Sequence, residues 1–301
     1  MPEDTQITAI IPSKGRFDMV KRLVGNLRSQ NFDQHSIEII IVDDGSEPRY
    51  EFEPGDHITL IRHDKSIGAQ ISRNDAIAMA KGRYILMLDD DIEFTSPDYI
   101  QKSVDILEKD DEIAAVFPRQ MVIRYLDNDK IERYEQLFSK TSAFTGEFIQ
   151  SDIKQGPIQW GHQVYLVRTD LLRDTGGFDS IFGLKGGHSF REESDVQAKL
   201  RKSGHKLWLD KSLSFNHHIV QTGGHGSNIG KRLYWIAHNH IIFTRRHLKC
   251  WPLKVIGFSY HILRYSYVQG RFKYLLPMVK GYCAGIRNAL RDQYPDKNQW
   301  I

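Results

Sequence analysis

The stretch Tyr84-Ile85-Leu86-Met87-Leu88-Asp89-Asp90-Asp91-Ile92-Glu93 runs from five apolar residues directly into three consecutive carboxylates. The apolar part is too short for an ordinary helix and predicts a buried strand. In an open α/β sheet, ligands bind at the carboxyl ends of the strands, where these carboxylates would lie. Three adjacent like charges repel one another, and a divalent cation such as Mg²⁺ would offset that repulsion. The stretch therefore predicts a metal site at a strand end, with a solvated acidic turn as the plainer alternative.

The segments around this stretch predict an α/β fold. Strands are expected at 7–11, 37–42, 58–61, 84–88 and 113–117, and helices at 17–27, 68–80 and 97–107. This alternation predicts β-α-β units and a mostly parallel sheet. The strand at 37–42 also runs into carboxylates, Asp43 and Asp44. Because the carboxyl ends of parallel strands meet at one edge, both acidic clusters are expected in one crevice.

The later part of the chain is less regular. Ser96 and Pro97 are expected to cap the helix at 97–107. Residues 119–157 are polar and weakly patterned, and an irregular excursion is expected there. Further strands are expected at 162–167, 206–209 and 213–215, with helices at 169–174, from Arg191 to Gly204 and from Lys231 onward. Acids in the first turn of the 191–204 helix would be favoured by the helix dipole alone.

Length and composition indicate a folded protein of ordinary polarity. The chain has 301 residues, 40% of them hydrophobic and 26% charged, which suits one large domain or a domain with an extension. Its first six residues carry acids rather than an apolar run, so no secretory signal is expected. No apolar run approaches the length of a membrane span. The two cysteines lack metal-ligand spacing and suit a reducing compartment.

The charges are distributed unevenly along the chain. From Lys211 to Arg291 there are thirteen Lys and Arg and no Asp or Glu, although the net charge of the whole chain is only +3. Such asymmetry points to an anionic partner. We expect residues 231–291, which are also rich in aromatics, to lie on an anionic membrane surface. The alternative is a lid packed on an acidic domain; nucleic acid is disfavoured because no binding motif accompanies the charge.

Taken in order, the motifs resemble a known family. They are Ile11-Pro12-Ser13, Val42-Asp43-Asp44-Gly45-Ser46, Ser72-Arg73-Asn74, Leu88-Asp89-Asp90-Asp91, Gly176-Gly177-Phe178-Asp179 and Glu192-Glu193-Ser194-Asp195. The set resembles the family 2 glycosyltransferases, inverting enzymes of the GT-A fold, over about residues 7–218. The resemblance implies a catalytic domain at 1–225, with a nucleotide-binding half at about 1–118 and an acceptor-binding half at about 119–225. Residues 226–301 would form a basic helical extension.

The resemblance also implies roles for single residues. Donor-binding residues are expected to be Pro12, Ser13, Arg16, Asp43, Asp44, Arg73, Asp89 and Asp90. Either Asp43 or Asp44 would contact the base and ribose. Asp91 and Asp89 match the outer acids of the Asp-X-Asp motif, and His217, with His218 as its alternative, matches a further metal ligand. Arg73 would bind the diphosphate or pair with nearby acids.

The proposed base departs from the family pattern. Glu193 stands where the family usually has a catalytic Asp, so Glu192 and Asp195 remain alternatives. Trp160 and Gly161 are expected to line the acceptor pocket, although a buried tryptophan is the commoner case.

These expectations combine into one function. The chemistry needs a divalent metal, Mn²⁺ or Mg²⁺, to neutralise the leaving diphosphate, and a carboxylate to take the acceptor proton. We expect a metal-dependent, inverting transfer from a UDP, GDP or dTDP sugar to a glycan or lipid-linked acceptor. Surface polysaccharide or glycolipid assembly at the cytoplasmic face of the membrane, with the protein held there peripherally, is the expected setting. The alternative is a catalytically silent nucleotide-sugar-binding or scaffold protein. A dinucleotide-dependent oxidoreductase is disfavoured, because the first strand leads into Pro12-Ser13-Lys14-Gly15-Arg16 and lacks the glycine fingerprint.

Overall fold

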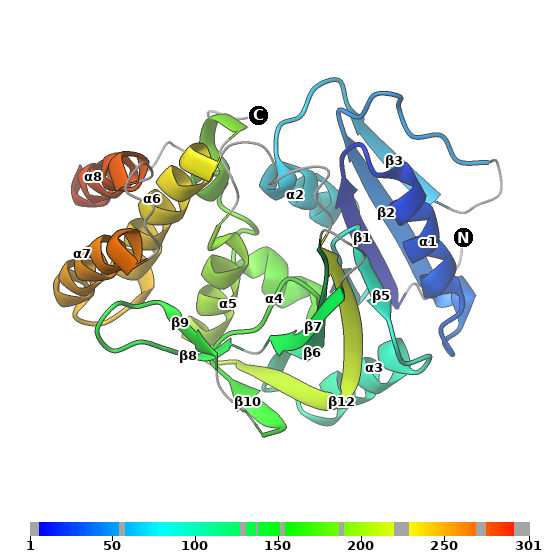
Figure 1. Cartoon of the computed structure of the whole chain (residues 1–301). Coiled ribbons are helices and arrows are strands. Elements are labelled where there is room, and N and C mark those ends of the chain that lie inside the picture. Colours follow the sequence, from blue (N-terminus) through cyan, green and yellow to red (C-terminus); the bar gives the residue numbers. More distant parts are fainter. Residues whose placement is uncertain are drawn as a thin grey trace.

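A computed structural model describes residues 6–53, 58–126, 131–136, 138–150, 154–186, 190–219, 229–268 and 275–291. One large mixed sheet runs through the molecule, with helices on both faces and three C-terminal helices to one side (Figure 1). The strands are β1 Ile7–Ser13, β2 Ile37–Asp44, β3 Ile58–His63, β4 Tyr84–Met87, β5 Ile92–Phe94, β6 Ile113–Tyr125, β7 Ile131–Gln136, β8 Phe138–Thr141, β9 Phe148–Gln150, β10 Gly156–Ile158, β11 Tyr165–Arg168 and β12 Lys206–Ile219. The helices are α1 Phe17–Arg28, α2 Ala69–Met79, α3 Tyr99–Lys109, α4 Thr169–Asp174, α5 Glu192–Lys202, α6 Ile229–His247, α7 Trp251–Val268 and α8 Leu275–Arg291.

The sheet order is β10-β12-β6-β11-β4-β1-β2-β3, with β5 and β7 pairing at its side. Strands β4, β1, β2 and β3 are parallel, and β12 is parallel to β6. Strand β11 is antiparallel to both of its neighbours, β4 and β6. The predicted mostly parallel α/β sheet is therefore confirmed, with antiparallel insertions that the pattern did not predict.

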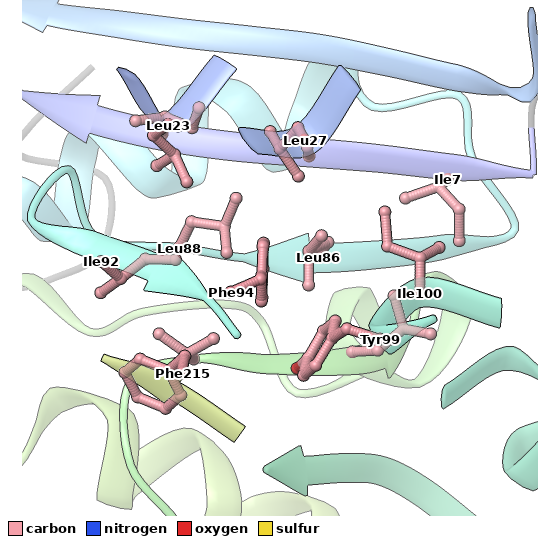
Figure 2. Packing of buried hydrophobic residues seen from close by; sticks show 14 of the residues in the cluster. Ile7, Leu23, Leu27, Leu86, Leu88, Ile92, Phe94, Tyr99, Ile100 and Phe215 are labelled. Atoms are coloured by element: carbon pink, nitrogen blue, oxygen red, sulfur yellow. The ribbon is translucent and has the colours of Figure 1, made fainter. Parts of the chain in front are cut away.

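Two hydrophobic cores lie on opposite faces of the sheet because strand side chains alternate. In β4, Leu86 and Leu88 enter one core while Ile85 and Met87 enter the other. The first core is closed by α1 and α3, as Figure 2 shows for Leu23, Leu27, Tyr99 and Ile100 packed around Ile7 and Leu86. The second core is closed by residues of α2, α4 and α5. Strands buried on both faces explain the continuous apolar runs of the sequence.

Several expected elements need correction. Residues 119–157 are not an irregular excursion, because β6 continues to Tyr125 and short antiparallel strands follow it. The two strands expected at 206–209 and 213–215 form one strand, β12, whose register with β6 shifts between Leu209 and Ser214. Helix α3 begins at Tyr99 after an N-cap at Asp98, two residues beyond the expected Pro97, and Ser96 Oγ accepts a hydrogen bond from the Asp98 amide at 3.3 Å.

The C-terminal helices build a core of their own and join the main domain through α6. Helices α6, α7 and α8 pack around Ala237, Ile241, Phe258 and Ile262. On its other side α6 places Ile242 and Phe243 against residues of the main domain. In the part of the chain that the structure describes, no helix has the length and apolar content that crossing a membrane requires. The expected boundary at 225/226 falls among residues 220–228, outside the described residues.

Candidate active site

The candidate site lies at the carboxyl ends of β4, β1 and β2. Strand β1 lies between the other two, so the residues that end these strands share one edge of the sheet. Ser13 ends β1 opposite Asp43, with Pro12 opposite Val42, and Asp89 to Asp91 follow β4. The expectation that both acidic clusters lie at one edge is confirmed.

A third element, β12, brings a histidine to the acids of β4. Strand β12 pairs with β5, which places His217 opposite Ile92, directly after Asp91. Ligand atoms of Asp89, Asp91 and His217 all lie within 4.8 Å of one another. His217 Nε2 is 3.3 Å from Asp91 Oδ1. Burial works against a charged imidazole, but the neighbouring Asp91 carboxylate outweighs it and raises the pKa of His217.

The next residue along β12 points elsewhere. The His218 ring lies between Tyr125 Oη, 2.8 Å from its Nδ1, and Glu93 Oε2, 3.3 Å from its Nε2. Alternation along the strand thus separates the two histidines, and His217 is the one that joins the acidic cluster.

This cluster suits a divalent ion in its chemistry. Two carboxylates and one imidazole make an oxygen-rich set that Mn²⁺ or Mg²⁺ accepts. Asp91 Oδ1 is buried, and among the described residues the imidazole of His217, whose Nε2 lies 3.3 Å away, is its polar neighbour. On the other side of the ring, the side-chain amide nitrogens of Gln120 and Gln163 lie 2.8 Å and 3.3 Å from His217 Nδ1. Such outer partners fix the orientation of a ligating histidine.

Arg16 pairs with two acids of the triplet, Asp90 and Asp91. Its Nη1 contacts Asp90 Oδ1 at 2.7 Å and Asp91 Oδ2 at 3.0 Å. Ser13 Oγ donates to Asp90 Oδ2 at 2.5 Å. Burial still dominates at Asp90 and raises its pKa to about 6, against the opposing charge of Arg16. Asp90 is therefore buried and joins the turn after β4 to the turn after β1, between the proposed metal ligands Asp89 and Asp91.

Asp43 and Asp44 have their oxygens occupied by protein donors. Asp43 accepts from the amides of Ser46 and Tyr50 and from Arg62 Nη1 at 2.6 Å. Asp44 accepts from Ser66 Oγ and from the amides of Ile67 and Gly68, and its Oδ1 is 2.9 Å from His63 Nδ1. Burial opposes ionisation of both groups, but these donors outweigh it and lower both pKa values. In this structure the two carboxylates order the loops after β2 and β3.

Arg73 on α2 connects the acidic triplet to helix α5. Its Nη2 lies 2.8 Å from Asp89 Oδ1 and 3.1 Å from Glu193 Oε1, and its Nη1 lies 3.8 Å from Glu192 Oε1. Burial would lower the pKa of Arg73, but the three carboxylates outweigh burial and raise it. Burial raises the pKa of Glu192 and Glu193, and Arg73 opposes that rise.

The Ser72-Arg73-Asn74 and Gly176-Gly177-Phe178-Asp179 motifs are hydrogen-bonded to each other beside Arg73. The side-chain amide of Asn74 donates to Phe178 O at 2.8 Å and accepts from Phe178 N at 2.9 Å. A Cβ at Gly177 would lie 2.5 Å from Asn74 Oδ1, so only glycine fits there. Arg73 in turn lies over the Phe178 ring, 5.2 Å from its centre. The Gly-Gly-Phe-Asp motif therefore supports the helix that carries Arg73.

Asp195 faces away from this cluster. It forms ion pairs with Lys199 at 2.7 Å, with His247 at 2.7 Å and with Arg246 at 3.5 Å, the last two from the end of α6. Burial alone would raise the pKa of Asp195, but His247 and Lys199 outweigh it and lower it to about 2. Of the three expected base candidates, Glu192 and Glu193 face Asp89 across Arg73, whereas Asp195 binds the C-terminal helices.

Trp160 and Gly161 lie in the protein interior. Trp160 is 2% exposed and stacks on Phe148, with Phe243 of α6 edge-on at 5.3 Å. A Cβ at Gly161 would lie 2.1 Å from Phe117, and the Gly161 amide donates to Gln197. These are the surroundings of core residues, so the commoner alternative for a tryptophan describes Trp160 here.

Sequence reasoning missed Gln120, Gln163 and Tyr50. The Tyr50 hydroxyl lies 2.8 Å from Ser13 Oγ and accepts from the Arg16 amide at 2.8 Å. No local pattern marks these residues, because each meets its partner through the fold of the chain.

Comparison with known proteins agrees with this arrangement. The family model described as glycosyl transferase family 2 matches residues 8–171. An uncharacterized glycosyltransferase of Haemophilus influenzae is 33% identical over 113 residues, which are 37% of this chain and 37% of that protein. The glucosyl-dolichyl phosphate glucuronosyltransferase of Haloferax volcanii is 23% identical over 216 residues, covering 69% of this chain and 67% of the relative. The matched region thus spans little more than a third of the first of these relatives.

Solved structures show the same fold. The Staphylococcus aureus protein TarS, in complex with UDP-GlcNAc, aligns with a TM-score of 0.62 at 12% identity, over 94% of this chain and 81% of that one. The mannosyltransferase PcManGT from Pyrobaculum calidifontis, in complex with GDP-Man and Mn²⁺, aligns with a TM-score of 0.55 at 13% identity, over 97% and 89%. Together with the sheet described above, they confirm a GT-A-type α/β fold. Because the family model covers more than half of the sequence, the chain belongs to glycosyl transferase family 2.

Proposed function

We propose that this protein transfers a sugar from a nucleoside diphosphate donor to an acceptor hydroxyl, by a metal-dependent single displacement that inverts the anomeric centre. The position of Arg73 carries the proposal. Nη2 of Arg73 contacts both Asp89 and Glu193. Asp89, which would bind the donor, and Glu193, which would take the acceptor proton, therefore lie on either side of one guanidinium.

Asp91, Asp89 and His217 would hold Mn²⁺ or Mg²⁺, which when bound neutralises the negative charge that develops on the leaving diphosphate. Their spacing and the buried oxygen of Asp91, 3.3 Å from His217 Nε2, support this assignment. The Mn²⁺ in the similar mannosyltransferase also favours it. Arg16, which reaches Asp91 from the turn between β1 and α1, would reposition toward the diphosphate when the ion takes its place.

Glu193 is the proposed general base. It takes the proton of the acceptor hydroxyl while that oxygen attacks the anomeric carbon and the bond from this carbon to the diphosphate oxygen breaks. Burial raises its pKa toward the range in which a base works best, and Arg73 keeps it from rising further. Glu192, with which it shares the arginine, is the alternative.

The donor would bind over the edge formed by Pro12, Ser13, Asp43 and Asp44. Because the oxygens of both aspartates are occupied, these residues would act on the nucleoside through the loops that they order. The UDP-GlcNAc and GDP-Man complexes of the similar structures favour a UDP- or GDP-linked sugar.

We further propose a glycan or lipid-linked acceptor and a peripheral position at the cytoplasmic face of the membrane. The acid-free segment from Lys211 to Arg291 supports a position at an anionic surface. The Haloferax relative is named for a dolichyl phosphate-linked sugar, which is consistent with such an acceptor.

Calorimetry and donor hydrolysis test the function together. We expect UDP or GDP to bind only with Mn²⁺ or Mg²⁺, and one nucleotide sugar of a panel to be hydrolysed. Asp91→Ala should lose the metal-dependent binding, whereas Glu193→Gln should keep binding and lose turnover by about 10²–10⁴-fold. Asp111→Ala, at a carboxylate 94% exposed, is the control.

Two results would contradict the proposal. Normal turnover by Glu193→Gln would remove the base assignment. Metal-dependent nucleotide binding without turnover of any donor or acceptor would favour the catalytically silent alternative, which the ion pair between Arg73 and Glu193 keeps open.

A further inference from the structure

Helix α7 presents an apolar stripe to solvent. Leu253, Ile256, Tyr260 and Leu263 are 64%, 63%, 60% and 56% exposed. Their spacing of three, four and three residues puts them on one face of the helix. Helices α7 and α8 lie at the outer edge of the molecule, beyond α6 (Figure 1). Contiguous apolar surface of this kind marks an interaction site on most soluble proteins.

The opposite face of the same helix is also apolar but is buried. Val255, Phe258 and Ile262 are at most 6% exposed and pack in the core of the C-terminal helices. A helix with apolar side chains on two opposite faces needs an apolar neighbour, protein or lipid, on each of them. The inner face of α7 has its protein partner, so only the outer face requires another.

Helix α8 also exposes a mixture of apolar and basic side chains. Its exposed residues include Leu276, Val279, Lys280, Arg287 and Leu290. They recur at intervals of three, four and seven residues, which again describes one face. No acid occurs among residues 211–291, so no carboxylate from this segment opposes these cations.

The surface is fixed firmly to the catalytic domain. A Cβ at Gly281 would lie 2.0 Å from the Tyr234 carbonyl oxygen, so α8 packs on the backbone of α6 with no room for a side chain. Helix α6 then reaches α5 through the ion pairs of His247 and Arg246 with Asp195. The helix that carries Glu193 therefore has a defined orientation relative to the outer faces of α7 and α8.

We propose that these outer faces form a docking surface for an anionic lipid membrane, with the apolar stripe of α7 entering the interface and Lys280 and Arg287 of α8 facing lipid phosphates. The inference rests on, and specifies, the membrane position given under the proposed function. Charge decides between lipid and a second copy of the chain. Two copies of this acid-free face would oppose cation to cation, whereas anionic lipid complements it.

Vesicle sedimentation of the whole chain tests the docking surface. Vesicles of phosphatidylcholine with a quarter phosphatidylglycerol are compared with pure phosphatidylcholine, at low and high salt. We expect binding to the anionic vesicles that salt weakens. The double variant Ile256→Asp/Leu263→Asp should reduce the vesicle-bound fraction by at least about tenfold, since burial of each apolar side chain favours the bound state by that factor or more.

Two further variants sharpen the comparison. Lys280→Glu/Arg287→Glu should reduce binding mainly at low salt, because salt already screens these cations. Met79→Asp, at an apolar residue 49% exposed at the end of α2, is the matched control and should bind as the unmodified chain does.

The docking surface is refuted if Ile256→Asp/Leu263→Asp binds anionic vesicles as well as the unmodified chain. It is also refuted if the unmodified chain ignores vesicles and forms a dimer that this variant dissociates, because the face would then be a protein interface. Calorimetric titration of the same variants with UDP or GDP and Mn²⁺ separates these results from the proposed chemistry. Unchanged nucleotide binding shows that only the docking surface has been altered.

Discussion

Replacing Arg73 with methionine would remove the cation on which three carboxylates depend. The Arg73 side chain is 5% exposed and pairs with Asp89 and Glu193, with Glu192 at 3.8 Å. Removing one partner of a buried ion pair costs about 3–5 kcal/mol, because the remaining charge stays buried without a partner. We expect Arg73→Met to lower the free energy of unfolding by about that amount at neutral pH.

This loss of unfolding free energy should also depend on pH, and the pKa shifts of Glu192 and Glu193 determine whether it grows or shrinks as pH rises. Burial already raises the pKa values of Glu192 and Glu193, and loss of the guanidinium raises them further. The folded variant then holds protons that its unfolded chain releases above pH 4.5, the usual pKa of a glutamate, so its stability falls as pH rises through that window. The deficit of Arg73→Met relative to the unmodified chain should therefore be larger at pH 8 than at pH 5.

Urea unfolding followed by tryptophan fluorescence and circular dichroism at both pH values measures this deficit. The control is Arg83→Met, whose side chain is 60% exposed and pairs with the exposed Glu108, and it should lose at most about 1 kcal/mol. A loss for Arg73→Met no larger than that of the control would refute the reasoning. A large loss that is equal at pH 5 and pH 8 would attribute the effect to packing rather than to charge.

Two further predictions concern the C-terminal helices. Asp195→Asn should lower the free energy of unfolding by about 3–5 kcal/mol at pH 7, because Lys199 and Arg246 lose their buried partner. The pKa of Asp195 is lowered to about 2, so its contribution to stability is present above the usual aspartate pKa of 3.8 and is lost as pH falls through about 2. Unfolding measured from pH 6 downward should show the variant and the unmodified chain converging, and a constant gap would contradict the ion-pair explanation. Gly281→Ala should cost about 1–3 kcal/mol, because its Cβ would push α8 from the Tyr234 carbonyl; a thermal midpoint equal to that of the unmodified chain would show that the helices separate without cost.

The sequence predicted the sheet well where strands are buried on both faces. Strands β1, β2 and β4 are continuous apolar runs because α1 and α3 cover one face and α2, α4 and α5 the other. Strand β7 has the opposite character: it carries charged residues such as Glu132 and Arg133 on an exposed hairpin, so its polar sequence looked like a loop. In β12 the polar Asp210 and Lys211 resembled a turn, but the register shift before Ser214 accommodates them within one strand.

The site was predictable where it follows strand ends. Asp89 to Asp91 and Asp43 to Asp44 lie where the pattern put them, since the carboxyl ends of parallel strands share an edge. The partners of the histidine were not predictable in the same way. Gln120 meets His217 across 97 residues, and the sequence around either residue carries no mark of the other. The roles of the acids, the histidine and the base remain predictions that the variants above test.

The interface between α6 and the main domain limits how this protein can be truncated. Ile242 and Phe243 of α6 pack beside Trp160. His247 and Arg246, at the end of α6, form ion pairs with Asp195 in the first turn of α5. A chain that ended before Ile229 would expose the apolar residues around Trp160 to water. It would also leave the buried Asp195 without two of its cationic partners, His247 and Arg246. The GT-A body and its C-terminal helices are therefore packed as one unit, and we expect a chain without these helices to expose apolar surface.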